Sequence, residues 1–142
     1  MPGMKSKTPF ALGLVLALAA ACAPPVRDLD TEEIGELTDL EELMYVKATI
    51  ADPRFKLARS LEGETPSDAD WAAFADMGAR LQVTSRHGKR FSMGPGFDAY
   101  LDELEQQAAA LETAAEARDA GATLRLALEI KGTCRACHDD YR

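Results

Sequence analysis

The stretch Cys134-Arg135-Ala136-Cys137-His138, near the C-terminus, constrains this chain more than any other part of the sequence. Two cysteines separated by two residues and followed directly by a histidine form the spacing typical of covalent attachment of a c-type haem. The two thiols add across the two vinyl groups at one haem edge, and the neighbouring imidazole reaches the iron. If the segment is helical, all three side chains share or border one face. The rest of the chain is then expected to enclose that haem.

Two other chemistries use the same residue types. A structural zinc ion takes about four nitrogen and sulfur ligands, and in the sequence only Cys134, Cys137 and His138 cluster. A fourth ligand would have to come from the distant His87 or Cys22. The two cysteines could also form a redox pair or a structural disulfide, but a redox pair of this spacing belongs in a βαβ context, and the chain shows no strand alternation. Covalent haem is favoured over these alternatives mainly because the motif coincides with an export signal and with a helical bundle pattern.

The N-terminal segment has the pattern of an export signal. Lys5 and Lys7 precede an apolar run from Phe10 to Ala21, which is the order of segments in a signal peptide. The run is too short to span a bilayer comfortably, and Pro24-Pro25 stop any helix behind it. We therefore predict that residues 1–21 are a signal peptide.

Cys22 is the odd cysteine of the chain. The segment Leu18-Ala19-Ala20-Ala21-Cys22 resembles the lipobox of bacterial lipoproteins, in which the cysteine receives diacylglycerol. Lipidation accounts for an unpaired cysteine in an oxidising compartment, whereas ordinary cleavage after Ala21 would leave a free thiol there. We expect a periplasmic lipoprotein that meets the membrane only through this lipid, with residues 22–29 as the linker.

Composition suits a single domain over residues 30–142. The chain has 142 residues, 46% of them hydrophobic, which supplies one core and leaves no room for a second domain. The formal net charge is −8, and an acidic surface disfavours nucleic acid and favours partners with basic surfaces. No nucleophile, catalytic dyad or carboxylate pair stands out, so we do not expect an enzyme.

Apolar residues recur at intervals of three and four along the chain, which predicts an all-α fold. A first helix should follow Asp30, which forms a capping-box pattern with Glu33, and should end or kink at Pro53. The other breaks in the pattern place a second helix from Thr65 or Ser67 to about Arg86 and a third from about Phe97 to Asp119. Gly121 is expected to break the third helix, and a fourth then runs to the end.

The periodicity also predicts which residues face inward, whereas His87 is expected in an exposed basic turn. The inward residues are Ile34, Leu37, Leu40, Leu43, Met44, Ala48 and Ala51 in the first helix, Trp71, Phe74, Met77 (or Gly78) and Leu81 in the second, Phe97, Leu101, Leu104, Ala108, Leu111 and Ala115 in the third, and Leu124 and Leu128 in the fourth.

The segment from Gly132 to Arg142, with the haem motif near the C-terminus, resembles the C-terminal haem helix of class II cytochromes c, the cytochrome c' family. The resemblance implies an antiparallel four-helix bundle with one covalent haem c on its C-terminal helix. It also implies attachment through Cys134 and Cys137 and iron ligation by His138. Redox partner proteins are the expected partners, and the sequence leaves open whether two copies pair as a homodimer.

In the resembled family, the side of the iron opposite the histidine faces the first helix. Low-spin members carry a methionine there, and high-spin members carry a bulky apolar residue over a vacant site. Met44 lies at the place of that methionine, although it could also simply fill the core, and Met77 and Met93 are rival thioether donors. The resemblance thus implies a periplasmic electron carrier with a His138/Met44 iron, and alternatively a five-coordinate haem protein that binds nitric oxide or carbon monoxide.

Overall fold

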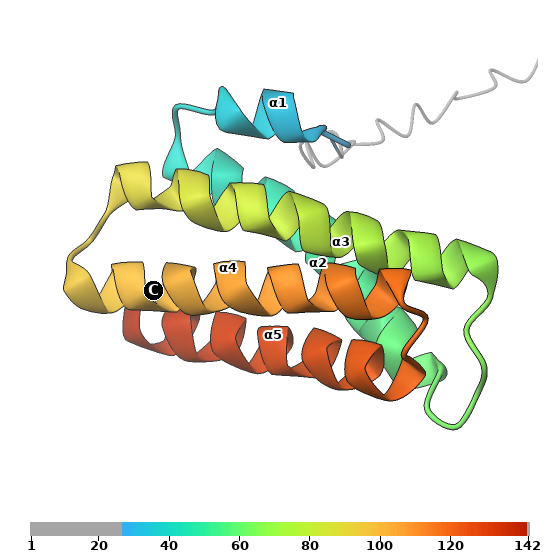
Figure 1. Cartoon of the computed structure of the whole chain (residues 1–142). Helices are drawn as coiled ribbons and strands as arrows, with labels where there is room; N and C mark the ends of the chain where they lie inside the picture. The colour runs from blue at the N-terminus through green and yellow to red at the C-terminus, as the bar shows by residue number, and fades with distance from the viewer. Residues whose placement is uncertain (1–26, 142) are drawn as a thin grey trace, which may run out of the picture.

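The computed structural model describes residues 27–141, which are mostly helical (Figure 1). The elements are α1 (Thr31–Gly35), α2 (Leu40–Ser60), α3 (Asp68–Gly88), the 3-10 helix η1 (Lys89–Phe91), α4 (Pro95–Glu116) and α5 (Ala120–Tyr141). No strand occurs within residues 27–141, so the all-α prediction is confirmed. The predicted signal peptide and Cys22 lie outside the described residues. Within the described part, none of the helices has the length and apolar character needed to cross a membrane.

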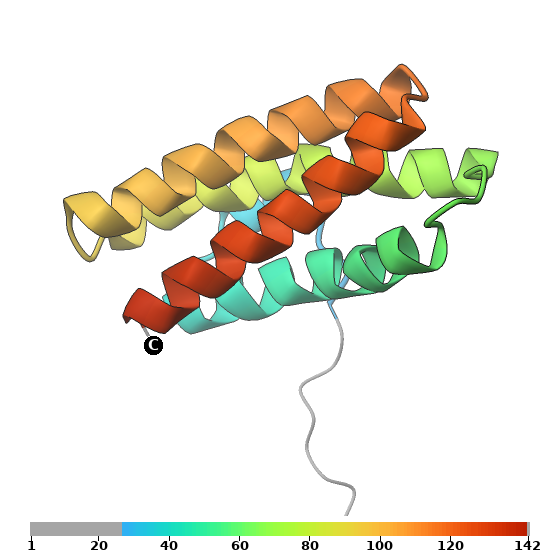
Figure 2. The ribbon, with the colours of Figure 1, turned by 90° about the horizontal axis from the view of Figure 1, so that it is seen from below.

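Helices α2 to α5 form the expected four-helix bundle, and α1 lies outside it against α3 (Figure 1). Each bundle helix packs against the next one in the chain, and α5 returns to α2, so the four helices close a ring. Figure 2 shows the C-terminal half of α5 beside the N-terminal half of α2. The most extensive contact joins α3 and α4.

The predicted first helix is in fact two helices. Asp30 caps α1 as expected: its Oδ1 accepts hydrogen bonds from the backbone N–H groups of Glu32 and Glu33 at 2.9 Å, and Glu33 Oε2 accepts one from the Asp30 N–H at 2.9 Å. The chain then leaves the helix, and Asp39 caps α2 by accepting from the Glu42 N–H at 2.8 Å. The prediction of one continuous helix is wrong because Asp39 provides a second N-cap.

Pro53 does not end α2, which continues to Ser60. A proline inside a helix removes one backbone hydrogen bond and normally costs about 3 kcal/mol or more. Beyond it, however, Phe55 and Ala58 are buried in the core. The burial of these two side chains offsets the cost of the proline and holds the rest of the helix in place.

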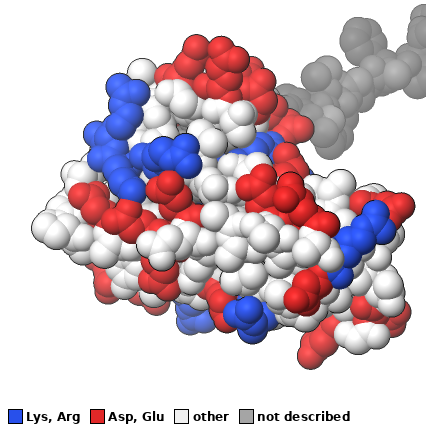
Figure 3. Space-filling view, viewed as in Figure 1, with Lys and Arg blue, Asp and Glu red and all other residues white. Residues whose placement is uncertain are grey.

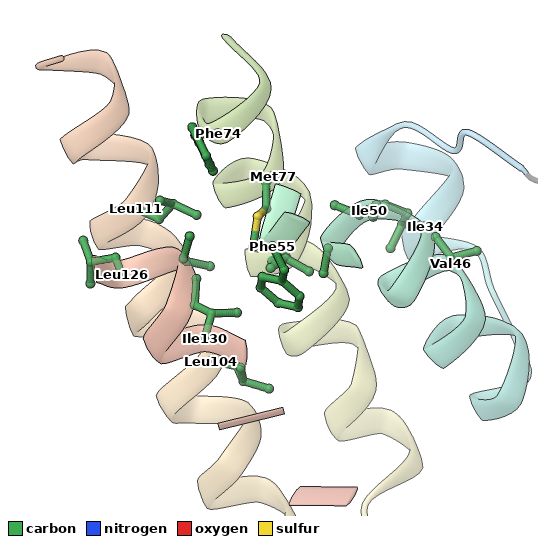
Figure 4. Packing of buried hydrophobic residues seen from close by; sticks show 14 of the residues in the cluster. Ile34, Val46, Ile50, Phe55, Phe74, Met77, Leu104, Leu111, Leu126 and Ile130 are labelled. Carbon is green, nitrogen blue, oxygen red and sulfur yellow. The ribbon is translucent and has the colours of Figure 1, made fainter. Parts of the chain in front are cut away.

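The core collects one face from each helix (Figure 4). Every residue of the stripe predicted on α4 is buried, and so are the four inward residues predicted on α3. Full burial of such a side chain contributes about 1.5–3 kcal/mol, so this apolar packing is the main source of the bundle's stability. Trp71 belongs to this core.

The turn before α5 lies earlier in the chain than predicted. Gly121 is inside the helix, and the break falls at residues 117–119, where Arg118 adopts a left-handed φ of 56°. Asp119 then caps α5 by accepting from the Ala122 N–H at 2.9 Å. The capping side chain therefore decides where the helix begins, rather than the glycine.

The inward face of α5 also differs from the prediction. Leu128 is 43% exposed and Leu124 is only partly buried. The side chains that α5 buries are Thr123, Leu126, Ala127, Ile130, Thr133 and Cys137. The buried face is thus rotated away from the two leucines toward the face that carries the cysteines.

His87 is not in an exposed turn. It lies in the last turn of α3, is 8% exposed, and its Nε2 donates a hydrogen bond to the carbonyl oxygen of Leu37 at 2.5 Å. Leu37 lies in the connection between α1 and α2. The predicted exposed position is wrong because this long-range bond satisfies the imidazole inside the protein.

Arg80 fixes the N-terminal end of the described chain to α3. Its guanidinium donates to Asp28 Oδ1 at 2.5 Å, to the Leu29 carbonyl oxygen at 3.2 Å and to Asp76 Oδ2 at 2.5 Å. Leu29 itself is buried in the core. The segment before α1 is thus held by one buried apolar side chain and by an arginine of α3.

We predict that Gly78→Ala lowers the free energy of unfolding by about 1–3 kcal/mol. A Cβ at this position would lie 2.7 Å from both the Ala108 oxygen and the Glu112 nitrogen, which are backbone atoms of α4, so α3 and α4 would have to separate. Denaturant unfolding followed by circular dichroism measures the change. Gly132→Ala is the matched control, since its added Cβ meets nothing within 4 Å, and it should raise stability by about 0.5–1 kcal/mol. Equal effects of the two substitutions would contradict the close approach.

Candidate functional site

A cleft opens among α2, α4 and α5, and its empty space, with the open mouth included, is about 530 Å³. Its walls carry mostly aliphatic and aromatic groups. The lining residues are Met44, Lys47, Ala48, Ala51, Asp52 and Phe55 from α2, Phe97, Leu101 and Leu104 from α4, and Cys134, Cys137 and His138 from α5.

The C-x-x-C-H motif lies on a continuous helix, and all three functional side chains border the cleft. Cys137 is buried, Cys134 is half-buried and His138 is exposed. Neither thiol is part of a disulfide, and burial raises the pKa of both. The prediction that the three residues share or border one helical face is confirmed.

The structure gives no support to the zinc alternative. Among residues 27–141, no group of three or more histidine, cysteine, aspartate or glutamate side chains is arranged to hold a metal ion. His87, one of the two distant candidates for a fourth ligand, is hydrogen-bonded to the carbonyl oxygen of Leu37 and does not line the cleft. Cys22, the other candidate, lies outside the described residues.

Met44 lines the cleft from α2, whereas Cys134, Cys137 and His138 line it from α5. It is half-buried, and it also borders the outer hollow at the mouth of the cleft, together with His138. The structure therefore brings the four predicted site residues together. Of the rival thioether donors, Met77 is fully buried in the core, and Met93 is 48% exposed and borders only the outer hollow.

Lys47 is a cleft residue that sequence reasoning missed. It is 6% exposed, and its Nζ donates a long hydrogen bond to Ser85 Oγ at 3.4 Å. Burial lowers the pKa of this amine, while the nearby thiols of Cys134 and Cys137 act in the opposite direction. The signal was present in the sequence, because Lys47 follows Met44 by three residues on the inward face of the helix, but lysine is rarely buried without a partner.

The last turn of α5 is held by aromatic and polar contacts with α4. Tyr100 donates a hydrogen bond to Asp140 Oδ2 at 2.7 Å, which raises the pKa of Tyr100 to about 12. Tyr141 packs edge-on against Phe97 and Tyr100, at ring-centre distances of 5.4 and 6.3 Å. One turn earlier than Cys137, Thr133 accepts a hydrogen bond from Gln107 at 3.0 Å. These contacts keep the motif face turned toward the cleft.

A family model described as Cytochrome C' matches residues 44–142. The chain belongs to the cytochrome c' family. The match begins at Met44 and includes the whole of the haem motif. No curated protein and no solved structure matches the chain.

Members of the cytochrome c' family are helical c-type cytochromes that bind haem covalently and are typically periplasmic. The residues of the cleft fit such a group. Two free thiols and an imidazole border one wall, and the walls that face them carry the apolar side chains of Phe97, Leu101 and Leu104. A macrocycle attached to α5 would therefore replace water against an apolar surface, which favours its binding.

We predict that Lys47→Leu stabilises the holoprotein at neutral pH, by on the order of 1–3 kcal/mol, because a buried polar group without a close partner is costly. Burial lowers the folded-state pKa of Lys47 below its ordinary value of 10.5. Between these two values the unfolded chain binds more protons, so the stability of the unmodified protein rises with pH. The advantage of the variant should therefore shrink toward pH 10.5.

Denaturant unfolding at several pH values measures this advantage. Lys56→Leu, which changes an exposed lysine of the same helix, is the control and should show little effect at any pH. An advantage for Lys47→Leu that is constant or grows with pH would contradict the prediction.

Proposed function

We propose that this cytochrome is a monohaem electron carrier in which Cys134 and Cys137 attach the haem while His138 and Met44 bind its iron. The observation that carries the proposal is the placement of Met44 and His138 in one cleft, on two helices that pack against each other. Imidazole and thioether are a common ligand pair in c-type cytochromes, and the thioether raises the reduction potential.

When bound, the haem supplies an iron centre that takes up and releases a single electron. The residues of the chain hold and shield that centre. The two cysteines fix one haem edge to α5, and the apolar residues Phe97, Leu101 and Leu104 exclude water from the cleft. A low local dielectric disfavours the more highly charged oxidised state and so raises the potential further.

Two protein ligands to the iron would favour electron transfer over substrate turnover, and we propose that the protein is not an enzyme. The two ligands come from helices that are each anchored in the core, α2 through Leu43 and Ile50 and α5 through Ile130. A rigid ligand pair changes little between the oxidised and reduced states. Small rearrangement on electron transfer is what a carrier needs.

The surface charge supports a redox partner with a basic docking face. The chain carries a formal net charge of −8, and Figure 3 shows acidic side chains spread over the face drawn there, with basic ones between them. Complementary charge speeds the encounter of two proteins and makes it sensitive to salt. We also propose that export is followed by lipidation of Cys22, which would confine this encounter to the membrane surface.

Covalent attachment should survive denaturation. We expect the unmodified protein to keep its haem through denaturing gel electrophoresis and acid extraction, whereas Cys134→Ala and Cys137→Ala should give much less holoprotein because only one thioether can form. Cys22→Ser is the control and should keep covalent haem in full. Haem that is lost from the denatured unmodified protein would rule out attachment by this motif.

Ligation by Met44 should be visible in the spectrum of the ferric protein. We expect a low-spin iron with the weak near-infrared band of a thioether ligand, and loss of that band together with a lower reduction potential in Met44→Ala. Met93→Ala, which alters a methionine at the mouth of the cleft, should keep the band. If the unmodified protein is instead high-spin and binds carbon monoxide or nitric oxide readily, Met44 is a packing residue and the gas-binding function replaces electron transfer.

Lipidation should be visible in the mass of the mature protein. Mass spectrometry is expected to show an N-terminal Cys22 that carries diacylglycerol, and Cys22→Ser should release the protein from the membrane fraction with its haem spectrum unchanged. A mature chain that begins at an unmodified Cys22 would show that the carrier is free in the periplasm.

A further inference from the structure

Lys47 lies on the same face of α2 as Met44, about one helical turn further along the chain. Both side chains line the cleft that Cys134, Cys137 and His138 border from α5. At 6% exposure, the lysine is held inside the protein and does not reach out to the solvent. Two long side chains that carry a potential metal-ligand atom, the Met44 sulfur and the Lys47 nitrogen, therefore line the same wall of the cleft.

The surroundings of the Lys47 amine offer little to stabilise a positive charge. Among residues 27–141 no carboxylate forms an ion pair with it, and Asp52, which also lines the cleft, is exposed. Its hydrogen-bond partner is the neutral hydroxyl of Ser85. The groups that favour the charged form are the thiols of Cys134 and Cys137, and cysteines that have become thioethers can no longer ionise. Burial then favours the uncharged amine.

An uncharged amine has a free lone pair, and nitrogen donors suit iron as imidazole does. We propose that Lys47 is a second iron ligand of the cleft, whose amine would bind the haem iron when Met44 does not. The inference rests on the proposed function in one respect, namely that the iron bound by His138 faces α2.

The exchange would require the Lys47 amine to leave Ser85, to which it donates one long hydrogen bond. The two side chains leave the same face of one helix, and the lysine stem is a flexible four-carbon chain. Lys47 would therefore supply a protein ligand to the iron if the thioether were lost. External ligands such as carbon monoxide would then have to displace a protein nitrogen, which weakens their apparent affinity.

The test compares five ferric holoproteins at neutral pH by electron paramagnetic resonance and near-infrared magnetic circular dichroism, which distinguish thioether from amine ligation. They are the unmodified protein, Met44→Ala, Lys47→Leu, Met44→Ala/Lys47→Leu and the control Met44→Ala/Lys56→Leu, whose lysine is exposed on α2. We expect Met44→Ala and the control to be low-spin with a nitrogen ligand, and Met44→Ala/Lys47→Leu to be high-spin. The reduced form of the latter should bind carbon monoxide at least about tenfold more tightly than Met44→Ala.

Added imidazole should return the high-spin double variant to a low-spin state, which shows that its haem site is intact. Two results would overturn the inference: a Met44→Ala protein that is already high-spin, and a nitrogen-ligated Met44→Ala spectrum that Lys47→Leu leaves unchanged.

The spectrum of the unmodified protein distinguishes a failure of this inference from a failure of the proposed function. A thioether band in the unmodified protein with a high-spin Met44→Ala variant rejects Lys47 and keeps Met44. A nitrogen-ligated unmodified protein that becomes high-spin in Lys47→Leu rejects Met44 and supports Lys47 as the resident ligand.

Discussion

The cleft depends on α5 remaining helical through its final turns with one face turned inward. Cys134, Cys137 and His138 meet at the cleft only because positions three and four apart adjoin on a helix. The ends of a helix fray easily when no side-chain contacts hold them. Here the hydrogen bond from Tyr100 to Asp140 and the edge-on packing of Tyr141 tie that end to α4. The first turns of α4 thus serve as the support on which the motif is presented.

The ring of four helices has one tight side and one open side. On the tight side α3 and α4 approach so closely that Gly78 has no room for a Cβ atom. The open side lies among α2, α4 and α5, whose side chains line the cleft. The closest helix contact therefore lies away from the site, whereas buried side chains of α4 such as Phe97 and Leu101 belong both to the core and to the wall of the cleft.

Local signals in the sequence predicted much of this structure. The stripe on α4 and the capping box at Asp30 follow from helical periodicity and from side chains a few residues apart, whereas the place of Met44 opposite the motif was implied by the resemblance to the cytochrome c' family. The errors have two sources. Competing local signals were ranked wrongly, since Asp39 starts a new helix and Asp119 overrides Gly121. The other errors depend on contacts between distant segments, which no local pattern contains.

His87 and Lys47 illustrate the second source. The bond from His87 to the Leu37 carbonyl joins residues far apart in the sequence, and a pattern that reads His87 with its basic neighbours places it in solvent. Lys47 is buried because α3 and α5 close over it, with Ser85 and the two cysteines around its amine. Lysine is rarely buried, but Lys47 follows Met44 by three residues and so falls on the inward face of the helix.

The attachment of the N-terminal segment to α3 has a mechanical consequence. A force applied to the chain ahead of Asp28 reaches the bundle through Arg80 and the buried Leu29. Arg80 is not part of the cleft lining, and the walls of the cleft come from three other helices. A pull on a membrane tether would thus act on α3, and the distances between Met44 and the motif on α5 would stay the same.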